Sequence, residues 1–91
     1  MANQANKRPM IIDSTGDVLK SGTLWGFIGV NVKPSAGNCA VILTDGDGNI
    51  IYQAAKTSAD SFTESWQSNT VNGLIVDTLT NITRIMILRD V

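Results

Sequence analysis

The sequence predicts an all-β protein, and three observations support this prediction. Every apolar run has the length of a strand and is bounded by turn-forming residues such as Gly, Pro, Ser, Asn and Asp. Residues 39–53 contain two such runs, which fold back on each other around an Asp-Gly-Asp-Gly-Asn turn at residues 45–49. Short strands and turns also recur regularly along all 91 residues. We therefore expect a compact antiparallel β-sandwich or jelly-roll-like domain of roughly seven to eight short strands.

The individual elements follow from the same alternation of apolar runs and breaks. Pro34-Ser-Ala-Gly-Asn38 is a loop, Ser68 and Asn69 interrupt the polar–apolar alternation, and Thr80 and Asn81 form a turn. Residues 54–60 are small and polar, so we expect an excursion between sheets or a short helical turn there. In chain order, the expected strands are 10–12, 18–19, 23–33, 39–44, 50–52, 61–67, 70–78 and 82–89.

The strand expected over residues 23–33 has two unlike faces. Its even positions, from Leu24 to Val32, form a continuous apolar face, which we expect to face the core because strand side chains alternate. Trp25 and Phe27 then lie on the opposite face. We interpret this outward aromatic pair as part of an oligomer interface; the alternative is that the rings fill the core. Glycines 26 and 29 indicate a bulge or bend.

The chain divides into a polar N-terminal arm, residues 1–9, and a single β domain, residues 10–91. A domain of this size buries only about two thirds of the surface of its unfolded chain, so association would stabilise it. The arm carries Lys7 and Arg8 and ends at Pro9. In an assembly such an arm can order against a neighbour. Lys7 and Arg8 are therefore candidate residues of a partner interface.

Composition argues against several classes of protein. The chain contains no His, so His-based triads, metal sites and proton shuttles are excluded. The net charge of −1 lacks the basic field that binding to nucleic acid or to an anionic membrane surface requires. The single cysteine, Cys39, cannot form an intramolecular disulfide and is expected to pack as a small hydrophobe. We expect a protein that is not an enzyme, made in a reducing cytoplasm.

The turn at residues 45–49 also resembles the beginning of a calcium-binding loop. Asp45, Asp47 and Asn49 occupy alternate positions, as ligands of an EF-hand do. Ile50 and Lys56, however, stand where that loop requires Gly and a bidentate Glu. We interpret the segment as a hairpin turn with carboxylates that titrate normally, and we predict no metal and no cofactor.

A second candidate surface involves Tyr52 and Trp66. Trp66 follows Glu64 in an alternating strand, and with Tyr52 it could form a ligand-stacking surface for sugars. Sequence positions do not establish that these three residues are neighbours.

The order of the segments resembles a known group of proteins. The polar arm leads to Gly22-Thr-Leu-Trp-Gly-Phe-Ile-Gly29, followed by Ala40-Val-Ile-Leu-Thr-Asp-Gly46. Thr70-Val-Asn-Gly-Leu-Ile-Val-Asp-Thr-Leu79 then precedes Arg84-Ile-Met-Ile-Leu-Arg89. From Met10 to Arg89 this order is similar to small β-sandwich virion structural proteins of tailed bacteriophages, in particular capsid decoration or cement proteins. The similarity lies in size, in composition and in the pattern of the strands. It includes no diagnostic motif, so no functional residue is assigned from it.

The resemblance implies a non-enzymatic capsid decoration protein that stabilises the capsid surface as a homo-oligomer, with a trimer favoured. It implies a major capsid protein or another virion protein as partner, synthesis in the host cytoplasm and a location on the virion. The alternative is a carbohydrate- or receptor-binding β module of a phage tail or baseplate.

Overall fold

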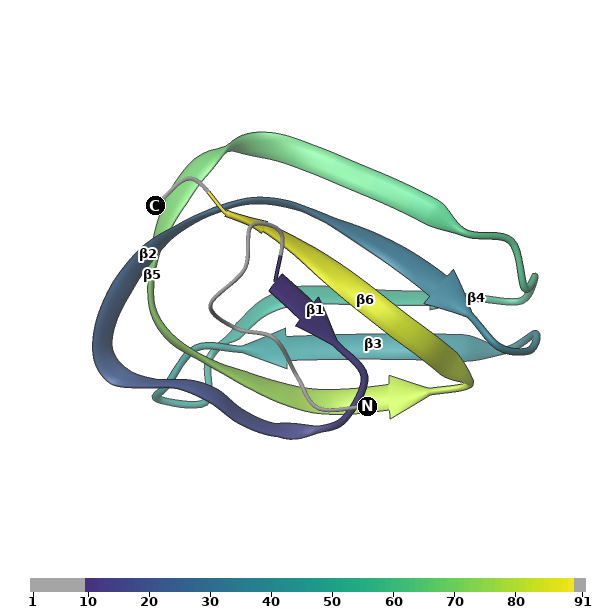
Figure 1. Ribbon diagram of the computed structural model, residues 1–91, viewed down its shortest axis with the longest axis horizontal. Helices are drawn as coiled ribbons and strands as arrows, with labels where there is room; N and C mark the ends of the chain where they lie inside the picture. The colour runs from purple at the N-terminus through teal and green to yellow at the C-terminus, as the bar shows by residue number, and fades with distance from the viewer. Residues whose placement is uncertain (1–9, 90–91) are drawn as a thin grey trace.

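Residues 10–89, which the computed structural model describes, form one antiparallel sheet of six strands (Figure 1). The order across the sheet is β1-β6-β2-β5-β3-β4, and no helix occurs among these residues. The all-β prediction is confirmed. The strands are β1 Met10–Ile12, β2 Gly16–Pro34, β3 Cys39–Thr44, β4 Ile50–Lys56, β5 Phe62–Thr80 and β6 Ile82–Arg89.

The sheet has fewer strands than predicted because β2 and β5 are unusually long. β2 contains both of the strands expected at residues 18–19 and 23–33, and β5 contains both of those expected at 61–67 and 70–78. The expected breaks are present as irregularities in pairing: β2 and β5 change register between Leu19 and Leu24 and again between Phe27 and Gly29. Polar and glycine residues therefore bend these strands without ending them.

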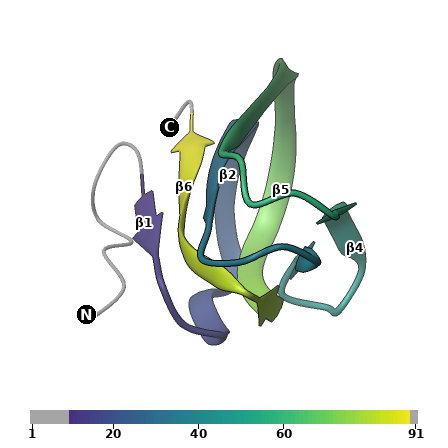
Figure 2. The same cartoon turned by 90° about the vertical axis from the view of Figure 1, so that its right-hand side faces the viewer.

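The two long strands give the sheet its curvature. The first part of β5 pairs only with β2, Ile75 and Val76 pair with both β2 and β3, and residues 78–80 pair with β3. β2 and β5 thus connect one side of the sheet, with β1 and β6, to the other side, with β3 and β4 (Figures 1 and 2). The sheet curves around a single apolar core, and β1 and β4 lie on opposite sides of the molecule (Figure 2).

The predicted outward direction of Trp25 and Phe27 is wrong. Both rings are buried, whereas Leu24, which was expected in the core, is 66% exposed. The cause is a bulge at Ile28, where β2 has one residue more than β6 between the pairs Phe27–Arg89 and Gly29–Leu88. The extra residue exchanges the two faces of β2, so that odd positions face the core before the bulge and even positions after it.

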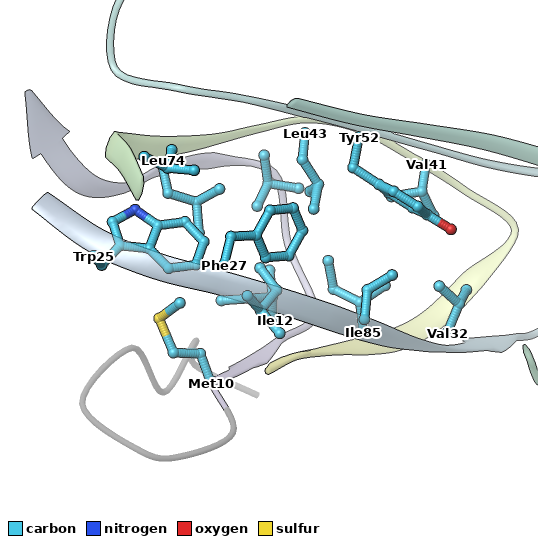
Figure 3. Packing of buried hydrophobic residues seen from close by; sticks show 14 residues of the cluster. Met10, Ile12, Trp25, Phe27, Val32, Val41, Leu43, Tyr52, Leu74 and Ile85 are labelled. Atoms are coloured by element: carbon cyan, nitrogen blue, oxygen red, sulfur yellow. The ribbon is translucent and has the colours of Figure 1, made fainter. Parts of the chain in front are cut away.

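The core lies between the two sides of the curved sheet, and Trp25 and Phe27 are its largest fully buried side chains (Figure 3). Its other fully buried residues come from five strands, β1, β2, β3, β5 and β6, and are Met10, Ile12, Val30, Val32, Val41, Leu43, Leu74, Val76, Ile85 and Ile87.

The central hairpin is confirmed. β3 pairs with β4 from Cys39–Lys56 to Thr44–Ile50 around the predicted turn. β4 continues to Lys56, so the excursion expected from residue 54 begins only after that residue. Cys39 is buried and has a free thiol.

Candidate functional site

Four aromatic rings form a continuous row from the core to the surface. Trp25 and Phe27 lie 5.2 Å apart between ring centroids, and Phe27 meets Trp66 edge-on at 4.9 Å. Trp66 then stacks on Tyr52 at 5.7 Å. This aromatic row joins β2, β5 and β4, because Tyr52 belongs to β4 and Trp66 to β5. It connects side chains whose strands are not adjacent in the sheet.

Hydrogen bonds hold both indole rings of the aromatic row in place. The indole N–H of Trp25 donates to the Gly73 carbonyl over 2.8 Å, and that of Trp66 donates to the Phe27 carbonyl over 3.0 Å. Phe27 lies directly before the bulge, where the ladder between strands is interrupted. Trp66 thus supplies a donor to a backbone carbonyl at the irregular point of the sheet.

The outer end of the aromatic row carries a hydrogen-bonded pair. The Tyr52 hydroxyl donates to Glu64 Oε1 over 2.7 Å. Burial raises the pKa of the Tyr52 phenol, and the hydrogen bond and negative charge of Glu64 raise it further. Tyr52 therefore acts as a neutral donor, while Glu64 itself is exposed.

The structure thus brings together Tyr52, Trp66 and Glu64, whose proximity the sequence left open. Tyr52, however, covers one face of the Trp66 ring. Sequence reasoning missed that Trp25 and Phe27 belong to the same aromatic row. It treated residues 23–33 as a regular strand, whereas the bulge at Ile28 lets both rings face the same core as Val30 and Val32. Lys7 and Arg8, the other candidate interface residues, lie outside the described residues.

The turn between β3 and β4 is closed by the carboxylate of Asp45. Its Oδ1 accepts hydrogen bonds from the backbone N–H groups of Asp47 and Asn49, each over 2.9 Å, and its Oδ2 accepts one from the Asn49 amide. The Asn49 N–H contributes most to holding the pKa of Asp45 below its ordinary value, although desolvation opposes this. The prediction of normal titration is therefore wrong for Asp45. The interpretation as a hairpin turn is confirmed.

Replacing Asp45 with Ala is expected to lower the melting temperature at neutral pH, because two backbone N–H groups lose their acceptor. The pKa of the folded state lies below the unfolded value of 3.8, so this stabilisation is fully present above that pH. It is lost as the pH falls through the folded pKa. The difference between wild type and Asp45→Ala in thermal melts should therefore shrink below about pH 4.

Asp47→Ala is the matched control, since Asp47 gives only its backbone N–H to this network. An equal loss of melting temperature in both variants would contradict the role assigned to Asp45. Within residues 10–89, no three His, Cys, Asp or Glu side chains are grouped as metal ligands would be.

In addition to the outer edges of β1 and β4, part of β5 lacks a hydrogen-bonded neighbour on one side within the described residues. Residues 62–65 and 69–70 of β5 pair with β2 on one side, residues 66–68 bulge out of that ladder, and β3 reaches β5 only from Ile75 onward. Within the described part of the chain, no strand pairs with the other side of residues 62–70. We call this segment the open edge of β5. Its only charged residue is Glu64, and it contains no Lys, Arg or Pro.

The site and the fold together define an all-β protein with an open strand edge beside an aromatic row. Comparisons with protein-family models, with curated proteins and with solved structures found no match for this chain. A search of the described residues for a helix long and apolar enough to cross a membrane found none.

Proposed function

We propose that this protein is a non-enzymatic structural protein of a bacteriophage virion. It is a capsid decoration or cement protein that binds the capsid surface as a homo-oligomer and stabilises the shell. Its partner is the major capsid protein or another virion protein, and it is made in the host cytoplasm. We also propose that the curved sheet is a β-sandwich, because its two sides pack on one core.

The open edge of β5 is the observation that carries this proposal. Unpaired strand edges of soluble proteins are usually shortened, covered or protected by Lys or Pro, because they otherwise pair with other chains. The open edge of β5 has no Lys or Pro. A protein that functions inside an assembly has a use for such an edge, since a neighbouring subunit can cover it.

The stoichiometry of the proposed oligomer comes from the resemblance, which favours a trimer. In a closed symmetric ring every copy makes the same contacts, so the open edge of β5 can be covered in each of them. Two further exposed apolar side chains, Leu24 and Ile50, are available for contacts with the capsid.

The proposal is tested by adding purified tagged protein to virions of the phage that encodes it, stripped of the native copies. We expect the protein to co-sediment with the particles and to raise the temperature at which they release DNA. The control is the variant Ile87→Asp, which we expect not to fold because Ile87 lies in the core. This variant should therefore not co-sediment with the particles. A folded wild-type protein that is monomeric and stays in the supernatant would refute the proposal.

The alternative function, a carbohydrate- or receptor-binding module of a tail or baseplate, is supported by the meeting of Tyr52, Trp66 and Glu64. An aromatic ring beside a carboxylate is suited to a sugar. A glycan array distinguishes the two functions: specific binding that is lost in Glu64→Ala favours the module, and an array without binding removes it.

A further inference from the structure

We propose that two copies of this chain pair side by side about a two-fold axis, so that the open edge of β5 in each copy binds the outer edge of β4 in the other. The inference rests on the self-association in the proposed function and identifies the surfaces that meet. It gives a pair of copies, whereas the resemblance favours three. The contact that it describes is formed by β4 and β5 alone.

The first argument is that the two edges lie on the same side of the molecule. β4 pairs with β3, and no strand among residues 10–89 pairs with its other side. The Tyr52 hydroxyl of β4 reaches Glu64 Oε1 over 2.7 Å. Lys56 Nζ lies 5.2 Å from the centroid of the Phe62 ring. β4 and β5 lie together away from β1 (Figure 2), so one contact on this side can cover both edges.

The second argument is the direction of the strands. Tyr52 contacts Glu64 and Trp66 of β5. Lys56, which comes later in β4, contacts Phe62, which comes earlier in β5. β4 and the open edge of β5 therefore run in opposite directions within one copy.

A two-fold axis along the strands keeps these directions and levels and exchanges the two sides of the sheet. β4 of one copy then meets β5 of the other in antiparallel orientation, as in every strand pair of this sheet. The two contacts, β5 with β4 and β4 with β5, are identical, as a two-fold interface requires.

The third argument is charge, which selects a second copy as the occupant. Glu64 is the only charged residue in residues 62–70, and Lys56 is the only one in β4. Both side chains are exposed. At the level set by the contacts within one copy, Lys56 of the other copy lies opposite Phe62, so Glu64 is its diagonal neighbour, within reach of a long side chain. Pairing β5 with β5, or β4 with β4, would instead join edges of like charge.

Charge reversal tests both edges. We expect Glu64→Lys and Lys56→Glu each to weaken the dimer at low salt by about tenfold or more, because like charges then meet in both contacts. A mixture of the two variants should regain association, since each contact between unlike copies again joins opposite charges. Sedimentation velocity at micromolar concentrations measures the dimer, and circular dichroism verifies the fold of each variant.

The mixture distinguishes a contact between copies from a contact within one copy. In each variant chain, residues 56 and 64 carry the same charge, whether or not the other variant is present. Association that returns only on mixing must therefore come from charges on different copies.

Tyr52→Phe and Lys33→Glu are the matched controls. Tyr52→Phe removes the hydrogen bond to Glu64 within one copy and leaves the charges of both edges unchanged. Lys33→Glu makes the same change of charge as Lys56→Glu at an exposed residue of β2, a strand inside the sheet. Both variants should associate as wild type does.

Three results would each overturn this pairing: a wild type that is not dimeric, a dimer that neither reversal weakens, and a mixture as dissociated as its separate components. Binding to virions is measured separately on the wild type. A trimer that binds virions would therefore refute the pairing and leave the proposed function standing, whereas a dimer that stays in the supernatant would do the reverse.

Discussion

Replacing Trp25 with Ala is expected to destabilise the protein by about 3–5 kcal/mol, the range for removal of a buried Trp or Phe. The ring is 2% exposed and contacts Phe27 in the aromatic row. Its indole N–H also satisfies the Gly73 carbonyl. Truncation therefore leaves both a cavity and a buried acceptor without its donor, and the second effect adds to the first.

The measurement is chemical unfolding followed by circular dichroism, with Leu24→Ala as the control. Leu24 is the adjacent residue of the same strand but is 66% exposed, so its truncation should change stability by no more than about 0.5 kcal/mol. If Trp25→Ala were as stable as wild type and only associated more weakly, the ring would belong to an interface, as the sequence pattern first indicated.

The second large effect is expected from Ile87→Asp, which should prevent folding. Ile87 is fully buried between β1 and β2, where it pairs with Met10 and Val30. A carboxylate at this position must lose its hydration or take up a proton, at a cost of several kcal/mol. Domains of this size are stable by only about 5–15 kcal/mol in total.

Ile42→Asp makes the same substitution at a less buried position, so the two variants compare the effect of burial. The sequence pattern places Ile42 and Ile87 alike in a dry core, because both lie in strands with continuous apolar runs. In the structure Ile42 is only half-buried, on the face of β3 opposite to Val41 and Leu43. We expect Ile42→Asp to fold with a loss of about 1–3 kcal/mol. Proton NMR spectra distinguish a folded from an unfolded variant, and two unfolded variants would contradict this difference in burial.

The local features of the fold could be predicted from the sequence. The turn at residues 45–49, β1 and β6 follow from turn chemistry and from short apolar runs, which are properties of neighbouring residues. The continuity of β2 through Ser21 and Gly22 could not be predicted, since it depends on pairing with β5, a strand distant in sequence, at Leu19 and Leu24 on either side of them. Glycines 26 and 29 indicated a bulge, but one residue of uncertainty in its position reverses every side chain that follows.

The candidate site was predictable only in part for the same reason. Tyr52, Glu64 and Trp66 were identifiable as residue types that could form a surface, yet their contact depends on how the two sides of the sheet close. The open edge of β5 could not be found in the sequence. An edge is defined by the absence of a partner strand, and this is a property of the topology alone.

The strand pairing also determines the order in which the chain can acquire structure. The hairpin of β3 and β4 is the only pairing between consecutive strands within the described residues. β1, by contrast, pairs with β6, so Met10 must find Ile87 at the far end of the sequence. Folding dominated by such distant contacts is slow. During synthesis, β1 therefore remains without its partner until β6 has left the ribosome, and until then the growing chain exposes apolar strands that other molecules can bind.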